Sequence, residues 1–322
     1  MNSRVVILLA LIWFPLTAYV MFRSALGALA NYLLLPAIPS VIVLYVLALR
    51  SWRESWVAIV GVSLISFWLL MAVAAPYLPL VDPNKPLVPF LAPGGVRHGI
   101  LFLLGSDMRG RDVLSRTVWG CQRVLVWGIT ATSVAYAVGA GCGLIAGYLG
   151  GWWDEFVSFA SNVLLSFPVM VLFILVLNLL GQSGFNIIIA VTCSSAPVIM
   201  RIVRGLALDA KSRDYIQAAQ TRGEHPLWIM LVELLPNVRG PIIVDASLRL
   251  GYTTVAITTL TFLGLGLQPP DPDWGLMIKE AATAALLWKY SYMMIVPALS
   301  VSSLILGFNL IADGLREMSL RD

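Results

Sequence analysis

Eight long apolar runs constrain this chain more than any other feature of its sequence. They lie at about 5–22, 33–49, 56–75, 124–147, 157–180, 185–203, 241–264 and 291–311. A helix needs about 20 consecutive apolar residues to cross the hydrocarbon core of a bilayer. A membrane barrel would instead show strands of about ten residues with alternating polar and apolar positions. We therefore expect an all-α integral membrane protein with eight candidate spanning helices.

Composition excludes an ordinary soluble protein and gives little support to nucleic-acid binding. Hydrophobic residues make up 59% of the chain and charged residues 12%, against about 25% charged residues in soluble domains. The net charge of +4 is modest for 322 residues, so we expect membrane lipid around the chain and no nucleic-acid partner. Cys121, Cys142 and Cys193 lie in or beside apolar runs without a regular spacing, which predicts neither disulfides nor a metal site.

Three polar stretches, about 76–123, 204–240 and 265–290, separate the later runs. Six prolines between 76 and 93 predict an extended segment rather than a continuous helix. Short loops rich in Lys and Arg favour the cytoplasmic side of a membrane. Their distribution here slightly favours cytoplasmic N- and C-termini, with 204–240 inside and 76–123 outside.

The first apolar run can be interpreted in two ways. Arg4 precedes it and Ala28-Leu29-Ala30 resembles a cleavage site, as in a signal peptide. The run is long for a signal, however, and two uncleaved helices at 5–22 and 33–49 would leave the orientation of the later spans unchanged. We therefore expect residues 1–55 to form an extension with two transmembrane helices.

The 204–240 stretch carries the most informative local pattern. Helix-forming residues run up to Arg222, Gly223 suits the left-handed position that ends a helix, and Pro226 suits the first turn of the next. This order predicts two short helices at a sharp bend. Ala218 and Ala219 would give the first helix a low-profile patch for another protein, although a merely solvated amphipathic loop is the alternative.

The same stretch resembles the EAA loop of bacterial ABC importer permeases. The resemblance rests on Gln217-Ala218-Ala219, on Gly223 six residues after Gln217, and on Leu235-Pro236. Two positions depart from the family pattern. Gln217 stands where the family usually has Glu, so a salt bridge made by that Glu would be absent, and Glu233 stands at a usually apolar position.

Further motifs narrow the resemblance to the dipeptide, oligopeptide and nickel permeases. They comprise the G-S-D-M-R-G-R-D-V-L-S-R segment at 105–116, A-G-Y-L-G-G-W-W-D at 146–154, S-F-P at 166–168, F-L-G-L-G-L-Q-P-P at 262–270 with D-W-G at 273–275, and F-N-L at 308–310 with D-G-L-R at 313–316. The chain is similar to the second permease subunit of such systems, which bears the G-R-D segment. The resemblance runs from about residue 56 to the C-terminus.

This resemblance implies an architecture and a set of partners. It implies a six-helix permease core preceded by the two extra helices: 1–55 as the extension, 56–123 as the first core helix and an extracytoplasmic segment, and 124–322 as the core with a cytoplasmic coupling loop at 204–240. The implied partners are a second permease subunit, two ATP-binding subunits and an extracytoplasmic substrate-binding protein in the bacterial inner membrane. No G-x-x-x-x-G-K-[ST] phosphate loop occurs here, so we expect ATP and Mg²⁺ in the partner subunits and no cofactor or catalytic residue in this chain.

Three groups of residues are the candidate functional positions. The resemblance assigns coupling to the ATPase to Asp214, Tyr215, Gln217, Ala218, Ala219, Gly223, Leu235 and Pro236. It assigns the extracytoplasmic family motif to Gly105, Asp107, Gly110, Arg111, Asp112, Ser115 and Arg116. For that motif we expect a structural role on a short membrane-surface helix, with Arg111 near Ser115 and Asp112 near Arg116. Thr254, Thr258 and Thr261 share one helix face, which suits either interhelical hydrogen bonds or a translocation path.

Two features inside the apolar runs complete the expectations. Gly139, Gly143 and Gly147 form a small-residue strip that predicts close packing against a facing helix, for which we look to a second permease subunit. Asp245 and Arg249 can pair with each other, snorkel, or take part in gating.

Two other classes of membrane protein were weighed against the permease interpretation. An intramembrane enzyme is disfavoured because both histidines, His98 and His225, lie in expected loops. A secondary transporter or channel would usually carry acids near the bilayer midplane. The substrate is left open among peptides, nickel or metal chelates, glutathione-like molecules and saccharides.

Overall fold

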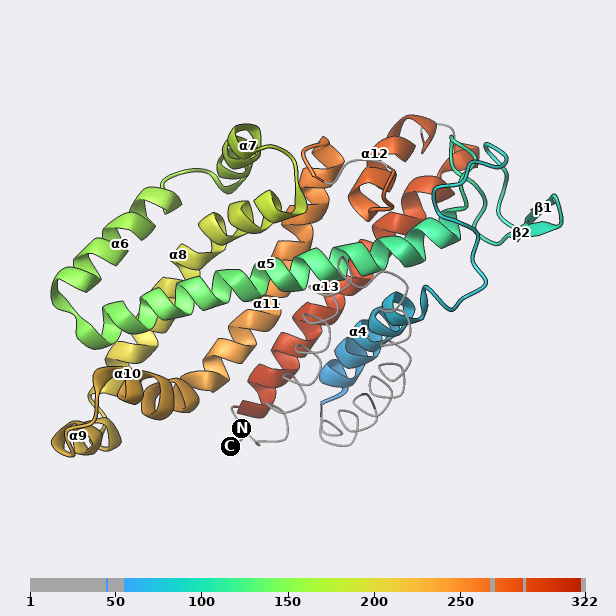
Figure 1. Cartoon of the computed structure of the whole chain (residues 1–322). Helices are drawn as coiled ribbons and strands as arrows, with labels where there is room; N and C mark the ends of the chain where they lie inside the picture. Colours follow the sequence, from blue (N-terminus) through green and yellow to red (C-terminus); the bar gives the residue numbers. More distant parts are fainter. Residues whose placement is uncertain (1–44, 46–54, 267–269, 286–287, 320–322) are drawn as a thin grey trace. The chain divides into compact units, whose positions relative to one another are not determined.

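The computed structural model describes residues 45, 55–266, 270–285 and 288–319 (Figure 1). The two helices expected within residues 1–54, and the alternative of a cleaved signal, therefore lie outside the described residues apart from residue 45.

The described part is almost entirely helical. Its helices are α4 (Trp56–Ala74), α5 (Val113–Leu149), α6 (Gly151–Leu165), α7 (Val169–Leu180), α8 (Gly184–Lys211), α9 (Asp214–Thr221), α10 (Pro226–Trp228), α11 (Leu235–Leu263), α12 (Trp274–Ala285) and α13 (Tyr292–Ser319). A π-helical turn, Ile229–Leu234, joins α10 to α11, and a 3₁₀ turn, Trp288–Tyr290, precedes α13. A small antiparallel hairpin pairs β1 (Gly95–Arg97) with β2 (Ile100–Phe102), with Val96 opposite Leu101.

In the described part of the chain, five helical segments are long and apolar enough to cross a membrane: α4, α5, α8, the continuous stretch from Pro226 to Leu263, and α13. The pair α6 and α7 also passes when it is taken together, but its two halves are bent by 92°. An all-α membrane protein is thereby confirmed, and all six apolar runs expected after residue 55 fall on these segments.

Two of the expected apolar runs differ from the helices that form there. The run at 157–180 is a broken span, because Ser166, Phe167 and Pro168 separate α6 from α7. A proline has no N–H to donate and disfavours helical backbone in the residue before it, so the break falls at Pro168. The second core run is longer than expected, since α5 begins at Val113 and crosses the boundary placed between residues 123 and 124.

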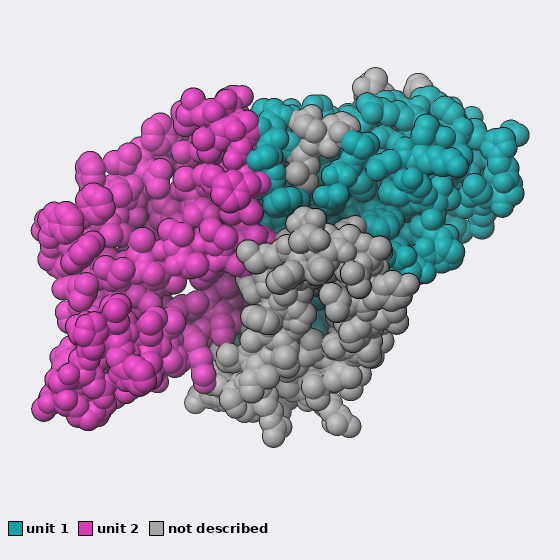
Figure 2. Space-filling model, in the orientation of Figure 1, with its two compact units in different colours: residues 1–129, 182–184, 250–322 teal, residues 130–181, 185–249 magenta. Residues whose placement is uncertain are grey.

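The described residues divide into two compact units (Figure 2): those within 1–129, 182–184 and 250–322 form unit 1, and those within 130–181 and 185–249 form unit 2. In unit 1, α4 packs closely on α13. A Cβ added at Gly61 would lie 2.8 Å from the backbone nitrogen of Ile311, and the indole of Trp68 donates to the Ser303 hydroxyl at 2.9 Å. Trp274 of α12 is fully buried, and its indole nitrogen donates to the Thr117 carbonyl at 2.9 Å. These contacts join α4 to α13 and α12 to α5.

The core of unit 2 forms where α5 crosses α8. Cβ atoms added at Gly139, Gly143 and Gly147 would each lie 2.7 Å from an atom of α8. The glycine strip therefore permits close helix packing, as expected. Its facing helix belongs to the same chain, so the strip is no evidence for a second permease subunit.

Candidate functional site: the loop between α8 and α11

Helix α9 packs against the rest of unit 2 through its buried face. Ile216 and Ala219 are three residues apart, share one face of the helix and are fully buried. Asp214 lies in the first turn, where a carboxylate is favoured by the helix dipole. Tyr215 is half-buried and packs against the same core, while the other α9 positions are polar or small and exposed.

Gly223 ends α9 in the way the sequence predicts. The Gly223 amide donates to the carbonyl of Gln220 at 2.9 Å, and the Glu224 amide donates to that of Ala219 at 3.2 Å. These two bonds form a Schellman motif, which requires a left-handed residue at its centre. Gly223 has φ of +75°, a conformation that disfavours any side chain with a Cβ.

The second half of the bend differs from the prediction of a short helix. Pro226 occupies the first turn as expected, and the His225 Nδ1 accepts from the Leu227 amide at 3.3 Å. The chain then continues without a break through the π-turn into α11. Pro236 lies just after that turn and cannot donate an amide hydrogen bond to Val232, so the widened turn falls where the regular ladder is interrupted. The second element is therefore the beginning of a spanning helix.

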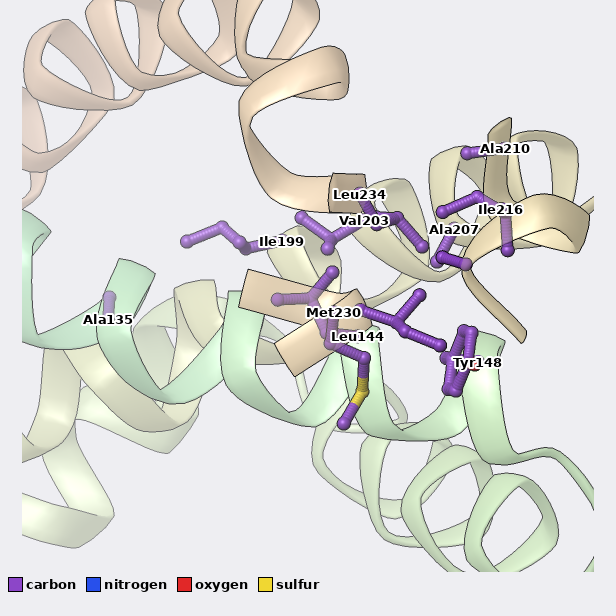
Figure 3. Packing of buried hydrophobic residues seen from close by; sticks show 12 residues of the cluster. Ala135, Leu144, Tyr148, Ile199, Val203, Ala207, Ala210, Ile216, Met230 and Leu234 are labelled. Atoms are coloured by element: carbon purple, nitrogen blue, oxygen red, sulfur yellow. The ribbon is translucent and has the colours of Figure 1, made fainter. Parts of the chain in front are cut away.

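A single apolar cluster supports the bend (Figure 3). It draws side chains from α5, α8, α9, the π-turn and their neighbours: Ala135, Leu144, Tyr148, Ile199, Val203, Ala207, Ala210, Ile216, Ala219, Ile229, Met230 and Leu234. Tyr148 adds polar contacts, because its carbonyl accepts from Lys211 Nζ at 2.7 Å and its hydroxyl accepts from Gln220 Nε2 at 3.2 Å. The bend is thus fixed to α5 and α8.

The structure divides the predicted coupling residues by exposure. Asp214, Gln217, Ala218, Gly223 and Pro236 are exposed, Tyr215 and Leu235 are half-buried and pack on the cluster, and Ala219 is fully buried. The expected patch of paired alanines is therefore wrong in one member: only Ala218 lies at the surface. The polar loop is also shorter than 204–240, since α8 extends to Lys211.

The two residues that depart from the family pattern, Gln217 and Glu233, make polar contacts within the bend. Gln217 is exposed, and its Nε2 donates to the Ser212 carbonyl at 3.3 Å. Arg222 lies 2.8 Å from Glu224 Oε1 and 3.5 Å from Glu233 Oε1. Glu233 thus takes part in an ion-pair network across the bend, although half-exposed pairs of this kind contribute little to stability.

The 105–116 motif forms a second, buried polar centre in unit 1. Asp107 Oδ1 accepts from the backbone amides of Arg109 and Arg111 at 2.8 and 2.9 Å. The Arg111 guanidinium lies 2.6 Å from Asp107 Oδ2 and 2.5 Å from Glu280 Oε2 of α12. Gly105 and Gly110 both have positive φ and form the turns beside these groups.

Two serines of this region fasten the proline-rich segment to it. Ser106 Oγ donates to the Val88 carbonyl and accepts from the Leu91 amide, and Ser115 Oγ donates to the Val81 carbonyl. The Asp112 carboxylate accepts from the Ser115 amide at 2.8 Å. This supports the structural role expected for the motif. The surface helix and its pairs are wrong, because Arg111, Asp112, Ser115 and Arg116 are buried and α5 continues directly into a span.

Comparison with known proteins decides the family. The family model described as the inner membrane component of binding-protein-dependent transport systems matches residues 139–318, which includes the whole α8–α11 loop. The chain belongs to this family. It is a multi-pass permease subunit of an ATP-driven importer, and so a transport subunit rather than an enzyme. An intramembrane enzyme and a secondary transporter or channel are thereby set aside.

Several known permease proteins are similar to this chain over most of its length. A dipeptide transport system permease protein, DppC, of Haemophilus influenzae is 32% identical over 263 residues, covering 81% of this chain and 88% of the relative. DppC of Alkalihalophilus pseudofirmus is 33% identical over 84% of this chain and 90% of the relative. A glutathione transport system permease protein, GsiD, of Escherichia coli O157:H7 is 38% identical over 66% of this chain and 70% of the relative.

The three threonines that share one face of α11 lie in a packed environment. Thr254, Thr258 and Thr261 are all buried. The hydroxyls of Thr254 and Thr261 donate to carbonyls of their own helix, and a Cβ added at Gly275 of α12 would lie 2.0 Å from the Thr261 hydroxyl. This packing favours an interhelical role, and a place for these residues on the translocation path stays a prediction.

The charged pair within α11 has a partner that the sequence did not indicate. Arg249 Nε lies 3.3 Å from Asp245 Oδ2, as expected for an i,i+4 pair, and the Tyr136 hydroxyl of α5 donates to the same carboxylate. The charge of Arg249 and the hydrogen bond from Tyr136 therefore stabilise the Asp245 carboxylate inside the apolar run.

Sequence reasoning missed two sets of residues. Glu280 links Arg111 and Arg116 from 164 or more positions away, so no local pattern indicates it. Leu227, Trp228 and Leu231 form an exposed apolar face beside α9. Their i, i+1, i+4 spacing after Pro226 is a helical signal that could have indicated this face.

Proposed function

We propose that the permease takes up small peptides, together with a second permease subunit, two ATP-binding subunits and an extracytoplasmic binding protein. The dipeptide and glutathione permeases among its relatives support a substrate of this class. In this arrangement the chain forms half of the translocation pathway, while ATP and Mg²⁺ bind in the partner subunits. The loop between α8 and α11 and both termini face the cytoplasm, and residues 76–112 face the opposite side.

The geometry of α9 carries the proposal. The helix exposes Asp214, Gln217 and Ala218 while Ile216 and Ala219 anchor it in the cluster shared with α5 and α8. A close-packed core transmits displacement rather than absorbing it. An ATPase subunit that docks on the exposed face and moves would therefore displace α5 and α8 with α9.

Apolar residues beside α9 enlarge the proposed docking face. Leu227, Trp228 and Leu231 are each 56% exposed and follow directly after the bend. Exposed aromatic and aliphatic side chains next to polar ones are typical of the centre of a protein interface. The single alanine in the exposed α9 face, Ala218, permits the closest approach of a partner's surface.

Enlarging Ala218 tests the coupling role. Ala218→Trp adds bulk on the exposed face of α9 without changing the buried face, so uptake and transport-linked ATP hydrolysis of the assembled importer should fall together. Leu208→Trp is a matched control, since Leu208 is a 44% exposed position of the neighbouring helix α8. Normal uptake by the Ala218→Trp importer, with the ATPase subunits bound in their usual amount, would contradict the proposal.

A further inference from the structure

The hairpin of β1 and β2 projects from the rest of unit 1 and is anchored to it by one face (Figure 1). Its tip, His98-Gly99, has φ of +51° and +73°, as a tight turn that matches the twist of two antiparallel strands requires. Phe102 of β2 is fully buried, and its carbonyl accepts from the amides of Gly94 and Gly105 at 2.9 and 3.1 Å. The face that carries Phe102 is therefore fixed to the protein.

Two aromatic contacts anchor the chain that leads into the hairpin and out of it. The Tyr292 hydroxyl of α13 lies 2.8 and 3.0 Å from the carbonyl oxygens of Leu91 and Ser106. The Phe90 ring lies 4.9 Å from the Tyr290 ring, centre to centre. The base of the hairpin is thus held against the start of α13. A surface fixed in this way loses little conformational freedom when it binds a partner, which favours affinity.

The opposite face of the hairpin is apolar and exposed. Val96 and Leu101 are directly opposite each other in the strand register, so their side chains share this face, and Leu103 follows two residues after Leu101. The three residues are 61%, 53% and 56% exposed. Contiguous exposed apolar side chains mark sites that contact a protein or a membrane, whereas isolated ones need no explanation.

The segment that carries this face, between the end of α4 and the start of α5, is basic at its surface. Its exposed charged side chains are Lys85, Arg97 and Arg109 against Asp82 alone. Arg109 is paired within the protein, whereas Lys85 and Arg97 have no ion-pair partner among the described residues. Lys and Arg are usually concentrated in cytoplasmic loops, so membrane topology does not explain cations in a segment proposed to face the other side. They favour an acidic partner.

The order of residues along the hairpin favours a protein over the bilayer as that partner. Arg97 and His98 lie at the tip, beyond Val96 and Leu101. Insertion of the tip into hydrocarbon would bury an unpaired guanidinium, which is costly. A protein interface accommodates both features, because such interfaces combine apolar side chains at the centre with a polar rim.

We propose that the β1–β2 hairpin is a docking element for the extracytoplasmic substrate-binding protein. Val96, Leu101 and Leu103 form the centre of the contact, and Arg97 meets a carboxylate of the partner at its rim. The inference rests on the proposed function, from which it takes the partner and the orientation. The hairpin recognises the surface of the binding protein, so the contact does not depend on which substrate is transported.

Equilibrium binding of the purified cognate binding protein to the complete importer in lipid nanodiscs tests the contact. Leu101→Gln makes the exposed face polar and Arg97→Glu reverses the charge at the tip, and each should weaken binding by about tenfold. Arg97→Lys keeps the charge and should bind as the unmodified importer does. Leu78→Gln is the matched control, because Leu78 is exposed in the same segment but outside the hairpin; it should leave binding unchanged.

The dependence of binding on salt distinguishes a charged contact from a structural effect. Added NaCl should weaken binding to the unmodified importer, because salt screens charges that are exposed before the partners meet. The loss of affinity with salt should be smaller for Arg97→Glu and unchanged for Leu101→Gln. An equal salt dependence in the unmodified and Arg97→Glu importers would contradict the role of Arg97.

The outcomes separate this inference from the proposed function. Full binding to the Leu101→Gln and Arg97→Glu importers, with uptake that still requires the binding protein, would overturn the inference and leave the proposed function intact. An unmodified importer that neither binds nor requires a binding protein would overturn both. A solvatochromic amino acid at position 101 tests the bilayer as the alternative partner, and its emission should shift to the blue only when the binding protein is added. Blue-shifted emission without the binding protein, quenched by brominated lipids, would place the hairpin in the bilayer and contradict the inference.

Discussion

Replacing Gly223 by Ala should destabilise the end of α9, and the free-energy cost should depend on the backbone conformation of residue 223 alone. A Cβ at this position would meet no atom within 4 Å, so the substitution creates no clash. The cost comes from φ of +75°, since the left-handed conformation disfavours a residue with a Cβ by about 1–2 kcal/mol. A free energy of this size corresponds to a factor of about 5–30 in the equilibrium between the closed and open bend.

Hydrogen exchange of the Glu224 amide reports this equilibrium. That amide is held by its bond to Ala219, which breaks when the Schellman motif opens. We expect peptides that contain residue 224 to exchange about 5–30 times faster in Gly223→Ala than in the unmodified permease, with no change in the α4–α13 region. Uptake should fall in parallel, because α9 no longer presents a fixed face.

Gly205→Ala is the matched control. Gly205 lies within α8, is exposed and has equally open space around an added Cβ, but its backbone is helical. The same substitution should there stabilise the helix by up to about 1 kcal/mol. Equal exchange rates for residue 224 in the Gly223→Ala and unmodified proteins would refute the argument that Gly223 is required by its conformation.

Three further predictions address the rest of the chain. Glu280→Gln should lower the free energy of unfolding by about 3 kcal/mol, since it leaves two buried arginines short of a counter-charge. Asp209→Asn, in the exposed pair with Arg213, should have no measurable effect on thermal unfolding. Equal melting temperatures of these two variants would contradict the buried network. Gly143→Ala should destabilise by about 1–3 kcal/mol through overpacking, because its Cβ would lie 2.7 Å from the Met200 carbonyl. Gly141→Ala meets no atom within 4 Å and, like Gly205→Ala, should stabilise its helix by up to about 1 kcal/mol in the same denaturation assay. Equal stability of the two variants would count against the close crossing. Deletion of residues 2–50 behind a start methionine should retain substantial uptake, and complete loss with normal membrane insertion would show that the extension is required; N-terminal sequencing that finds a mature start near Asn31 would refute the two uncleaved helices.

Local chemistry explains why part of the loop could be predicted from the sequence. A glycine after a run of helix formers and a proline three residues later determine backbone conformation within a few positions, so the bend at Gly223 and Pro226 followed directly. The break at Pro168 depends on the same chemistry, although the long apolar run around it predicts one continuous helix.

Long-range contacts explain most of what the sequence did not reveal. The i,i+4 spacing of Asp112 and Arg116 predicts a local pair, but Arg116 lies nearest to Asp107 and to Glu280, which belongs to a distant helix. The glycine strip showed that a helix must approach closely, and it carried no information on whether that helix was α8 or another subunit. Which of two adjacent alanines faces the core likewise depended on the rotation of α9 about its axis.

Site-specific photo-cross-linking from α9 tests the central claim most directly. A photoreactive amino acid at the exposed position 218 of the assembled importer should give a covalent product with an ATP-binding subunit, while the same residue at position 96, which is exposed in the hairpin, should give none. Cross-linking to the ATP-binding subunit from position 96 and not from position 218 would contradict both the coupling role of α9 and the proposed orientation.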